Sequence, residues 1–452
     1  MKKSIHTPDA PPSVLLRSLL QSGLQSSLQL QRASGKSQAS VSRALANSGT
    51  DVITLGKAQH TRYGLLHSIR GDSGQQPIFM TQADGSTQHW GSLAWLHGQW
   101  LHISCDAGEW TTQGNVPWFM QPLRPQGFLG RLRGQQMGYA ESNPELWPLD
   151  TVLHSLLHGD RDPPGALTLG DRESTPHTLA PADSQARAAW YDTQAQSIGR
   201  SFPAGSSAGG EQAKFLAHIE TDNPHEQQHV IVKFTPPRGT PFGERWHDLL
   251  HTEALAAQVL HAHGFAVAPT RVLHSARRTY LESVRFDRVG KYGKRHAVAL
   301  SAAHAAFVTG PQQHWPASCA ALAQLGLLSE SDAQQAACLH SFGRLIGNTD
   351  MHFGNLSLLV EDLTALKKPQ LRLAPSYDML SMAWRPSEFR DEIGYTAFEL
   401  PHPRLGEGAA WQQAIPMALD FWQRLSELQE VDAALRRVAA AQHQRLASAD
   451  YF

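Results

Sequence analysis

Three polar residues in the C-terminal half of the chain have the types and the spacing that phosphoryl transfer needs. Asp350 and Asn355 stand five residues apart in GNTDMHFGN (355 − 350 = 5), and Asp378 follows 23 residues later (378 − 355 = 23). In the catalytic loop of protein kinases this interval separates an aspartate that accepts the hydroxyl proton from an asparagine that binds magnesium. Asp378 follows a strand-like run, where a kinase aspartate would hold magnesium against the phosphates. The spacing predicts Asp350 as general base and Asn355 and Asp378 as metal ligands.

A lysine inside an apolar strand predicts a buried ion pair. Lys233 lies in VIVKF (230–234), and burying its ammonium is costly unless it meets an anion. Glu253 occupies one position in the apolar stripe of a helix predicted between Glu244 and His263, so it needs a cation in turn. Kinases hold the lysine that contacts ATP phosphates with such a glutamate. The alternative is that both side chains lie in solvent at the edges of their elements.

The elements around these residues follow from periodicity. A helix that carries Phe342 and Leu345 is expected to end at Gly347, and Leu356 to Val360 is typical of a buried strand. Asp350 and Asn355 then lie on a short loop between rigid elements. Taken singly, Asp350 could instead form an Asx turn and Asp378 could cap a helix.

A run rich in glycine and serine, IGRSFPAGSSAGG, precedes two strands predicted over Lys214 to Ile219 and His229 to Phe234. Free backbone N–H groups in such a loop can form a nest for phosphate oxygens, and glycine lets the backbone approach closely. Runs of this composition are more commonly flexible linkers. The following hairpin favours the phosphate-binding interpretation.

Charge is divided unevenly along the chain. Residues 1–66 hold eight lysines and arginines against two acids, a balance of +6, which leaves 31 − 38 = −7 for the rest. This asymmetry indicates an N-terminal part that faces nucleic acid on a neutral-to-acidic body, although a basic surface without a partner has the same composition.

The N-terminal part has the element order of a winged helix-turn-helix. Apolar residues predict helices over 14–20, 28–33 and 41–45, and strands over 51–55 and 62–66 enclose a polar turn. The exposed face of the third helix and the wing would contact DNA. The residues expected there are Gln38, Ser40, Ser42, Arg43, Lys57 and Arg62. The alternative is a winged helix that binds protein.

Composition limits the class of protein. A length of 452 residues predicts about two to four domains. The three cysteines, Cys105, Cys319 and Cys338, are too few for a disulfide framework, which favours a cytoplasmic location, with association with the nucleoid left open. No run reaches the roughly 18 apolar residues of a membrane helix.

Six segments carry a resemblance to the HipA family of toxin-like Ser/Thr kinases, most closely to its YjjJ (HipH) type with an N-terminal helix-turn-helix. These segments are RPQGFLGR (124–131), GSSAGGEQAKF (205–215), VIVKF, RFDR (285–288), GNTDMHFGN and APSYDMLS (374–381). The resemblance implies an α+β, two-lobed HipA-like fold that resembles protein kinases and uses ATP and Mg²⁺ on a protein serine or threonine.

The resemblance also implies residue roles. Lys233, Glu253 and Asp350 would be catalytic, and Ser206 aligns best with a phosphate-loop serine that family members autophosphorylate. The residues implied for nucleotide binding are Ser206, Ser207, Gly209, Gly210, Lys214, Lys233, Arg285, Phe286, Asp287 and His352.

The sequence departs from the family pattern at two places. GEQA (210–213) replaces the usual AQEK, so the lysine nearest the phosphates is either Lys214 or absent. Segment 296–307 lacks the usual acidic stretch, which leaves the substrate open. A HipB-like antitoxin normally supplies the DNA-binding module, whereas this chain carries its own. We expect a protein substrate and DNA as partners; an antitoxin or a second copy is left open. The expected domains are a winged helix (1–70), a β-rich subdomain (71–198), an N-lobe (199–290) and a helical C-lobe (291–452).

Three alternative functions remain open. HEQQH (225–229) matches the H-E-x-x-H motif of zinc proteases, but Asn223-Pro224 before it and an apolar strand after it disfavour the required helix. His247 and His251 are one helical turn apart and are expected at the surface. The predicted metal site could also serve a DNA nuclease, or the chain could be a DNA-binding regulator without catalysis.

Overall fold

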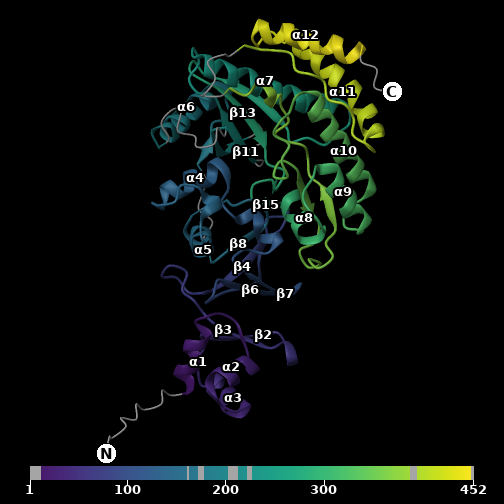
Figure 1. Ribbon diagram of the computed structural model, residues 1–452. Helices are drawn as coiled ribbons and strands as arrows, with labels where there is room; N and C mark the ends of the chain where they lie inside the picture. Colours follow the sequence, from purple (N-terminus) through teal and green to yellow (C-terminus); the bar gives the residue numbers. More distant parts are fainter. Residues whose placement is uncertain are drawn as a thin grey trace, which may run out of the picture.

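The structure is a computed structural model that describes residues 12–159, 162–171, 178–201, 212–220, 227–386 and 394–448. A small N-terminal part projects from a larger body (Figure 1). The body begins with a sheet next to the N-terminal part, continues into a second sheet, and ends in helices that pack beside both (Figure 1). Among the described residues, no helix is long and apolar enough to cross a bilayer.

The N-terminal part consists of three helices and a small sheet. These are α1 (Pro12–Leu20), α2 (Ser27–Ser34), α3 (Gln38–Ala46), and strands β1 (Gln25–Ser26), β2 (Val52–Leu55) and β3 (Arg62–Leu65) in the order β1-β3-β2, with a short 3₁₀ helix η1 (Ala58–His60). Ser26 and Gln29 form a capping box at α2, and Gly35 ends that helix with φ 66°. Leu16, Leu20 and Leu30 are buried between the helices. The three helices and two longer strands predicted here are confirmed.

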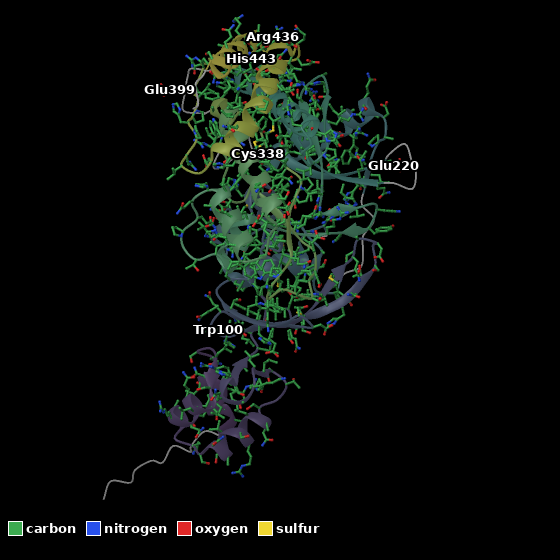
Figure 2. The ribbon with its side chains drawn as sticks, turned by 90° about the vertical axis from the view of Figure 1, so that its right-hand side faces the viewer. Trp100, Glu220, Cys338, Glu399, Arg436 and His443 are labelled. Atoms are coloured by element: carbon green, nitrogen blue, oxygen red, sulfur yellow. The ribbon has the colours of Figure 1, made fainter. Side chains whose placement is uncertain are left out.

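A small apolar contact joins this part to the body. Leu55 packs with Leu96 and Trp100, and a β-bridge links Leu66 to Leu96. A Cβ on Gly23 would lie 3.1 Å from Trp100 Nε1, so the segment around Gly23 approaches the body closely there. Figure 2 shows Trp100 at this junction.

The first sheet of the body is antiparallel, with strand order β7-β6-β5-β4-β8. It comprises β4 (Gln75–Thr81), β5 (Thr87–Leu96), β6 (Trp100–Cys105), β7 (Gly108–Gln113) and β8 (Leu167–Leu169); η2 (Trp118–Leu123), α4 (Gly127–Gln136), η3 (Pro144–Leu146) and α5 (Leu149–His158) lie between β7 and β8 in the chain. The strand predicted at 100–103 lies within β6. Trp90, Trp95 and Phe119 are buried in an apolar core that continues into the C-terminal helices.

The second sheet has the order β12-β13-β11-β10-β9. It comprises β9 (Leu179–Ala180), β10 (Lys214–Glu220), β11 (Gln227–Phe234), β12 (Thr270–His274) and β13 (Thr279–Val284), with α6 (Ser184–Ser201) and the long helix α7 (Pro241–Ala262). Thr240 caps α7, and Pro241 occupies its first turn. Helix α7 contacts β12 and β13 and also α11, so it is covered by both the sheet and the C-terminal helices. The predicted strands and helix are confirmed.

The C-terminal part combines a three-stranded sheet with helices. Its elements are β16 (His296–Ala299), β17 (Ser357–Val360) and β18 (Leu371–Leu373), the hairpin of β14 (Arg288–Val289) and β15 (Gly293–Lys294), and the helices α8 (Leu300–Phe307), α9 (Trp315–Gln324), α10 (Glu330–Leu345), η4 (Met382–Trp384), α11 (Gly408–Glu427) and α12 (Ala433–Ser448). Gly347 follows α10 with φ 76°, and a Cβ there would lie 2.7 Å from the Phe398 ring. The helix stop predicted at Gly347 and the strand predicted over 356–360 are therefore observed.

His296 links the first sheet to the C-terminal sheet. The buried imidazole donates from Nε2 to the Phe119 carbonyl at 2.8 Å and accepts at Nδ1 from the Ala166 amide at 3.2 Å. Both bonds require the neutral imidazole with its proton on Nε2, because a protonated Nδ1 would face another donor. Burial lowers the pKa of His296 to about 4.

We predict an acid-sensitive link at this position. The unfolded imidazole has a pKa of about 6.5, so the folded state binds fewer protons between pH 4 and 6.5. His296 therefore leaves stability unchanged above about pH 6.5 and lowers it, by at most about 1.4 kcal/mol per pH unit, as the pH falls toward 4. Urea unfolding of wild type and His296→Gln at pH 7.5 and pH 5 measures how much of the stability lost on acidification is due to His296. The variant should lose less stability on acidification; the exposed His60→Gln is the control, and equal losses in all three proteins would contradict the prediction.

Candidate active site

A buried ammonium group lies between two carboxylates where the second sheet meets the C-terminal part. Lys233 on β11 donates from Nζ to both carboxylate oxygens of Glu253 on α7, at 2.7 and 2.8 Å. It also donates to Oδ1 of Asp378, which follows β18. The Lys233 and Glu253 side chains are 8% and 4% exposed, whereas that of Asp378 is 25% exposed. The ion pair predicted from the sequence is formed, and Asp378 extends it.

The charges in this cluster shift one another's pKa. Burial alone would lower the pKa of Lys233, but Asp378 and Glu253 outweigh it and raise the value above its ordinary range. Burial raises the pKa of Glu253, and Lys233 opposes that effect only in part. Burial would also raise the pKa of Asp378, but Lys233 and Lys214 outweigh it and lower the value. Asp378 is therefore ionised, and it is the more exposed of the two carboxylates.

The loop after α10 is held by its own side chains. Asn355 donates from Nδ2 to the Asp350 carbonyl at 2.7 Å, which closes the loop and leaves the amide oxygen as the end that can ligate a cation. The Asp350 amide donates to Oδ1 of buried Asn348 at 3.0 Å. Asn348 also contacts Met379 Sδ at 3.4 Å, next to Asp378. Asn348 was not singled out from the sequence, although it stands two residues before Asp350.

Asp378 has a backbone conformation that L-residues seldom adopt. Its φ is 56°, in the left-handed region where aspartate is tolerated better than most residues. The preceding residue, Tyr377, shares a hydrogen bond of 2.8 Å with the Ser357 hydroxyl and donates to the Gly354 carbonyl at 2.9 Å. The loop that carries Asp378 is thus tied to the loop that carries Asn355. Strained backbone of this kind is typical of functional sites.

A cavity of about 1210 Å³ opens in front of these groups. Charged and polar side chains line one end, namely Lys214, Lys233, Glu253, Asn355, Tyr377 and Asp378. Leu216, Ile231, Ala268 and Phe286 line it as well and give it apolar walls. Further on, the cavity reaches Trp110, Trp118 and Arg124 in the β7–α4 region. An apolar slot next to cations and oxygen ligands has the chemistry to hold a flat base and its phosphates.

Comparison with known proteins identifies the family. The HipA-like C-terminal domain family matches residues 206–447, and the YjjJ-like toxin middle domain family matches residues 72–177. The curated protein Toxin YjjJ of Escherichia coli (strain K12) is 34% identical over 438 residues, which cover 94% of this chain and 95% of that protein. This chain belongs to the HipA family and is of the YjjJ type.

A solved structure supports the fold of this HipA-family chain. The complex of HipA, HipB and operator DNA from Shewanella oneidensis MR-1 contains a chain that matches with a TM-score of 0.51. The match covers 82% of this chain and 95% of that chain at 15% identity. The two chains therefore share the HipA-like fold that the sequence resemblance implied.

Two residues implied for nucleotide binding have their side chains engaged elsewhere in this HipA-family chain. Arg285 donates to Asp287 at 3.0 and 2.9 Å and to Asp162, and Arg288 pairs with both aspartates. Asp287 also accepts from the Gly165 amide at 2.9 Å. Burial would raise the pKa of Asp162, but Arg285, His229 and Arg288 bring it below its ordinary range. The 285–287 segment still lines the cavity, where Phe286 lies against Tyr377 with ring centroids 5.5 Å apart.

The other predicted residues have different positions. Lys214 pairs in register with Lys233 and lines the cavity. Asp350 is half-buried and His352 is exposed, and neither is among the lining residues; the His352 ring accepts from the Gly354 amide at 3.0 Å. Ser206, Ser207, Gly209 and Gly210 lie outside the described residues.

The residues predicted to bind DNA lie at the end of the molecule. Figure 1 places α3 far from the body. On α3, Gln38, Ser42 and Arg43 are exposed and Ser40 is half-buried. Lys57, between β2 and β3, and Arg62, the first residue of β3, are both exposed. His229 of the H-E-x-x-H match lies on strand β11, so this histidine is not on the helix that a zinc protease needs.

We predict that the buried ion pair is energetically coupled. Lys233→Met leaves two carboxylates close together and should lower the free energy of unfolding by about 3–5 kcal/mol. Lys233→Met with Glu253→Gln should cost less than the two single changes together, with a coupling of about 1–3 kcal/mol. Urea unfolding of the four proteins measures the difference.

The exposed pair of Arg372 and Glu361 is the matched control. Its N···O distance is also 2.7 Å, but its side chains are 53% and 45% exposed. The same cycle there should give a coupling below about 1 kcal/mol. Equal coupling at both pairs would refute the role of burial.

Proposed function

We propose that this chain is a toxin of a toxin–antitoxin type system that acts as an ATP- and Mg²⁺-dependent serine/threonine protein kinase and carries its own DNA-binding domain. The observation that carries the proposal is the contact of Lys233 with both Glu253 and Asp378 in the wall of a cavity that Asn355 also lines. This is the set of groups with which kinases position ATP phosphates and magnesium.

The residues present fit the cofactors. Asn355 and Asp378 supply an amide and a carboxylate oxygen, the hard ligands that Mg²⁺ prefers, and when bound the ion neutralises charge on the phosphates. Lys233 and Lys214 would hold phosphate oxygens, and the apolar walls formed by Leu216, Ile231 and Phe286 would enclose the base. Arg285 and Asp287 also line the cavity, but their side chains pair with each other within the fold.

Asp350 would act on the acceptor. Its loop is fixed by Asn348 and Asn355, so the carboxylate can accept the proton of a serine or threonine hydroxyl in a defined position. Its half-buried position outside the nucleotide cavity agrees with this role, because the acceptor hydroxyl belongs to a protein substrate that approaches from solvent. We also propose Ser206 in the phosphate loop as a site of autophosphorylation.

The N-terminal part would bind operator DNA. In the complex from Shewanella oneidensis, HipA is accompanied by HipB and operator DNA. In the present protein, three helices and a small sheet with exposed Arg43, Lys57 and Arg62 precede the HipA-like part within the same polypeptide. We propose that residues 1–70 form a winged helix that supplies DNA binding in cis, followed by a β-rich subdomain (71–198), an N-lobe (199–290) and a C-lobe (291–452).

We predict that Asp350→Asn strongly slows phosphorylation. Wild type and variant are incubated with ATP and Mg²⁺, and intact mass and peptide mapping follow phosphate on the protein. Loss of the general base should lower the rate by about 10²–10⁴-fold while the fold is kept. The matched control is Asp362→Asn, which changes an exposed aspartate shortly after β17. Equal phosphate on Asp350→Asn and wild type would refute the assignment, and nicking of plasmid DNA by the same samples would favour a nuclease.

We predict that DNA affinity depends on the basic residues of the N-terminal part. In the full chain, joint replacement of Arg43, Lys57 and Arg62 by alanine should weaken DNA binding and lower the slope of log K against log salt by about 2–3. The control replaces three exposed cations of the body, Arg277, Lys368 and Arg437, by alanine. Fluorescence anisotropy with a labelled duplex at several salt concentrations gives both values. A slope unchanged by the first triple, or lowered as much by the second, would contradict the prediction.

A further inference from the structure

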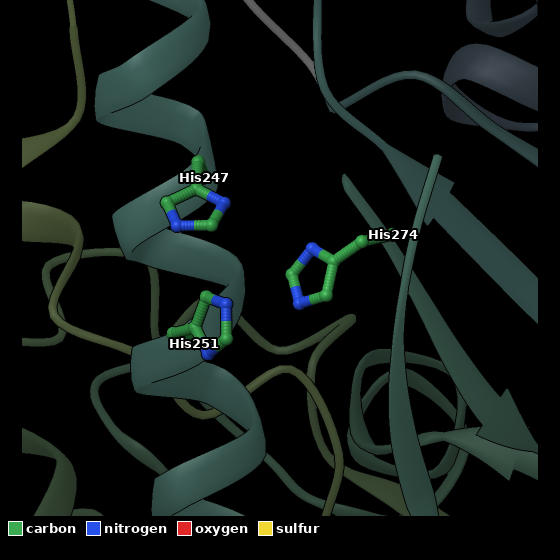
Figure 3. Close-up of side chains that lie close together, drawn as sticks. All are labelled: His247, His251 and His274. Atoms are coloured by element: carbon green, nitrogen blue, oxygen red, sulfur yellow. The ribbon is translucent and has the colours of Figure 1, made fainter. Parts of the chain in front are cut away.

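Three histidines, two on α7 and one on β12, lie close together outside the candidate active site. His247 and His251 lie one turn apart on α7, and His274 lies at the end of β12. Figure 3 shows their rings around a common space. Each offers a ring nitrogen within 4.8 Å of the other two. The rings of His251 and His274 are stacked at 16° with centroids 5.4 Å apart.

The helical histidines are buried, which corrects the expectation that they lie on the surface. His247 and His251 are 4% and 7% exposed, because the sheet and the segment around Glu430 cover this face of α7. Among the described residues, Nε2 of His251 has no hydrogen-bond partner, and Figure 3 shows it directed at the space between the rings. A buried nitrogen without a partner costs free energy, so a ligand at this point would satisfy it.

Neighbouring hydrogen bonds select the nitrogens that could bind a ligand. Nε2 of His247 donates to the Glu430 carbonyl at 2.8 Å, which leaves the lone pair on Nδ1. Nδ1 of His274 lies 3.3 Å from the Thr279 hydroxyl, and donation there leaves the lone pair on Nε2. Histidines that bind metals are commonly fixed by a second hydrogen bond to a carbonyl or another oxygen in this manner.

The Thr279 hydroxyl and the Arg238 guanidinium are the neighbouring groups that oppose the binding of a cation here. The Thr279 hydroxyl lies 2.7 Å from Nδ1 of His247 and has to turn away before that nitrogen can bind. Arg238 is the nearby positive charge, and it is paired with Glu244 at 2.9 Å. Burial first, and then the neighbouring imidazoles, lower the pKa of His251 to about 3, so the ring is neutral at physiological pH.

We propose that His247, His251 and His274 bind a divalent transition metal, with Zn²⁺ as the ion best suited to three imidazoles. Zinc–nitrogen distances of about 2.0–2.1 Å require the nitrogens to approach to about 3.4 Å. His274 is exposed and can make most of this movement, and its exposure admits a water molecule as fourth ligand. Mg²⁺ prefers oxygen ligands, so this site would be distinct from the one at Asn355 and Asp378.

A metal here would join α7 to the sheet. Helix α7 carries Glu253, two residues after His251, and β12 belongs to the sheet that carries Lys233. The bound ion would therefore fix α7, which carries Glu253, against the sheet that carries Lys233. The proposal does not depend on kinase activity, since its test measures metal and stability.

The test uses the full chain without a polyhistidine tag. Protein treated with chelator is dialysed and titrated with Co²⁺, whose visible d–d bands report a tetrahedral nitrogen site, and with Zn²⁺, followed by metal analysis and thermal unfolding. The measurements are made in the presence of Mg²⁺. The variants are His274→Ala, chosen because this side chain is exposed, and His251→Gln. The control is His261→Ala, which removes an exposed histidine from the same helix.

Wild type and His261→Ala should bind one equivalent of metal. They should show the d–d bands with Co²⁺ and unfold at a higher temperature with Zn²⁺ than without it. His274→Ala and His251→Gln should bind at least about tenfold more weakly and lose the bands and the thermal shift. Circular dichroism without metal shows that the variants are folded. Absence of stoichiometric binding in wild type, or equal binding in His274→Ala and wild type, would overturn the proposal.

Discussion

The need to compensate one buried ammonium group organises the centre of this molecule. Lys233 lies on a strand whose neighbours are apolar, and an ammonium there is tolerated only because Glu253 and Asp378 accept its hydrogen bonds. These three residues come from β11, α7 and the segment after β18. Satisfying one charge thus fixes the second sheet, its long helix and the C-terminal part relative to one another, and leaves Asp378 at the edge of the cavity.

A second buried ionic network also contributes to the wall of the cavity. Asp162, Arg285, Asp287 and Arg288 satisfy one another, so the segment that follows β13 is held rigidly. His296 adds a neutral link between the first sheet and the C-terminal sheet. The cavity is therefore bounded by parts of the chain that an apolar core and two sets of polar contacts hold together, and a ligand would enter a preformed site.

Local signals in the sequence predicted much of the fold. Strands 214–219 and 229–234, the helix ending at Gly347 and the elements of the N-terminal part were predictable because periodicity, caps and glycines act over a few residues. The pairing of Lys233 with Glu253 was predictable because each charge stood in an apolar pattern. Asp162 was not found, since its partners are more than a hundred residues away and nothing near it marks it as buried.

The sequence by itself determined the family, the order of the elements and the residue types available for chemistry, because motifs and propensities are properties of neighbouring residues. Only the tertiary structure decided which of those residues meet. It brought Asp378 to Lys233, engaged Arg285 and Asp287 within the fold, and buried His247 and His251 beside His274. Burial and partnership depend on packing between distant segments, and the same side chain is a surface group or a ligand according to what covers it.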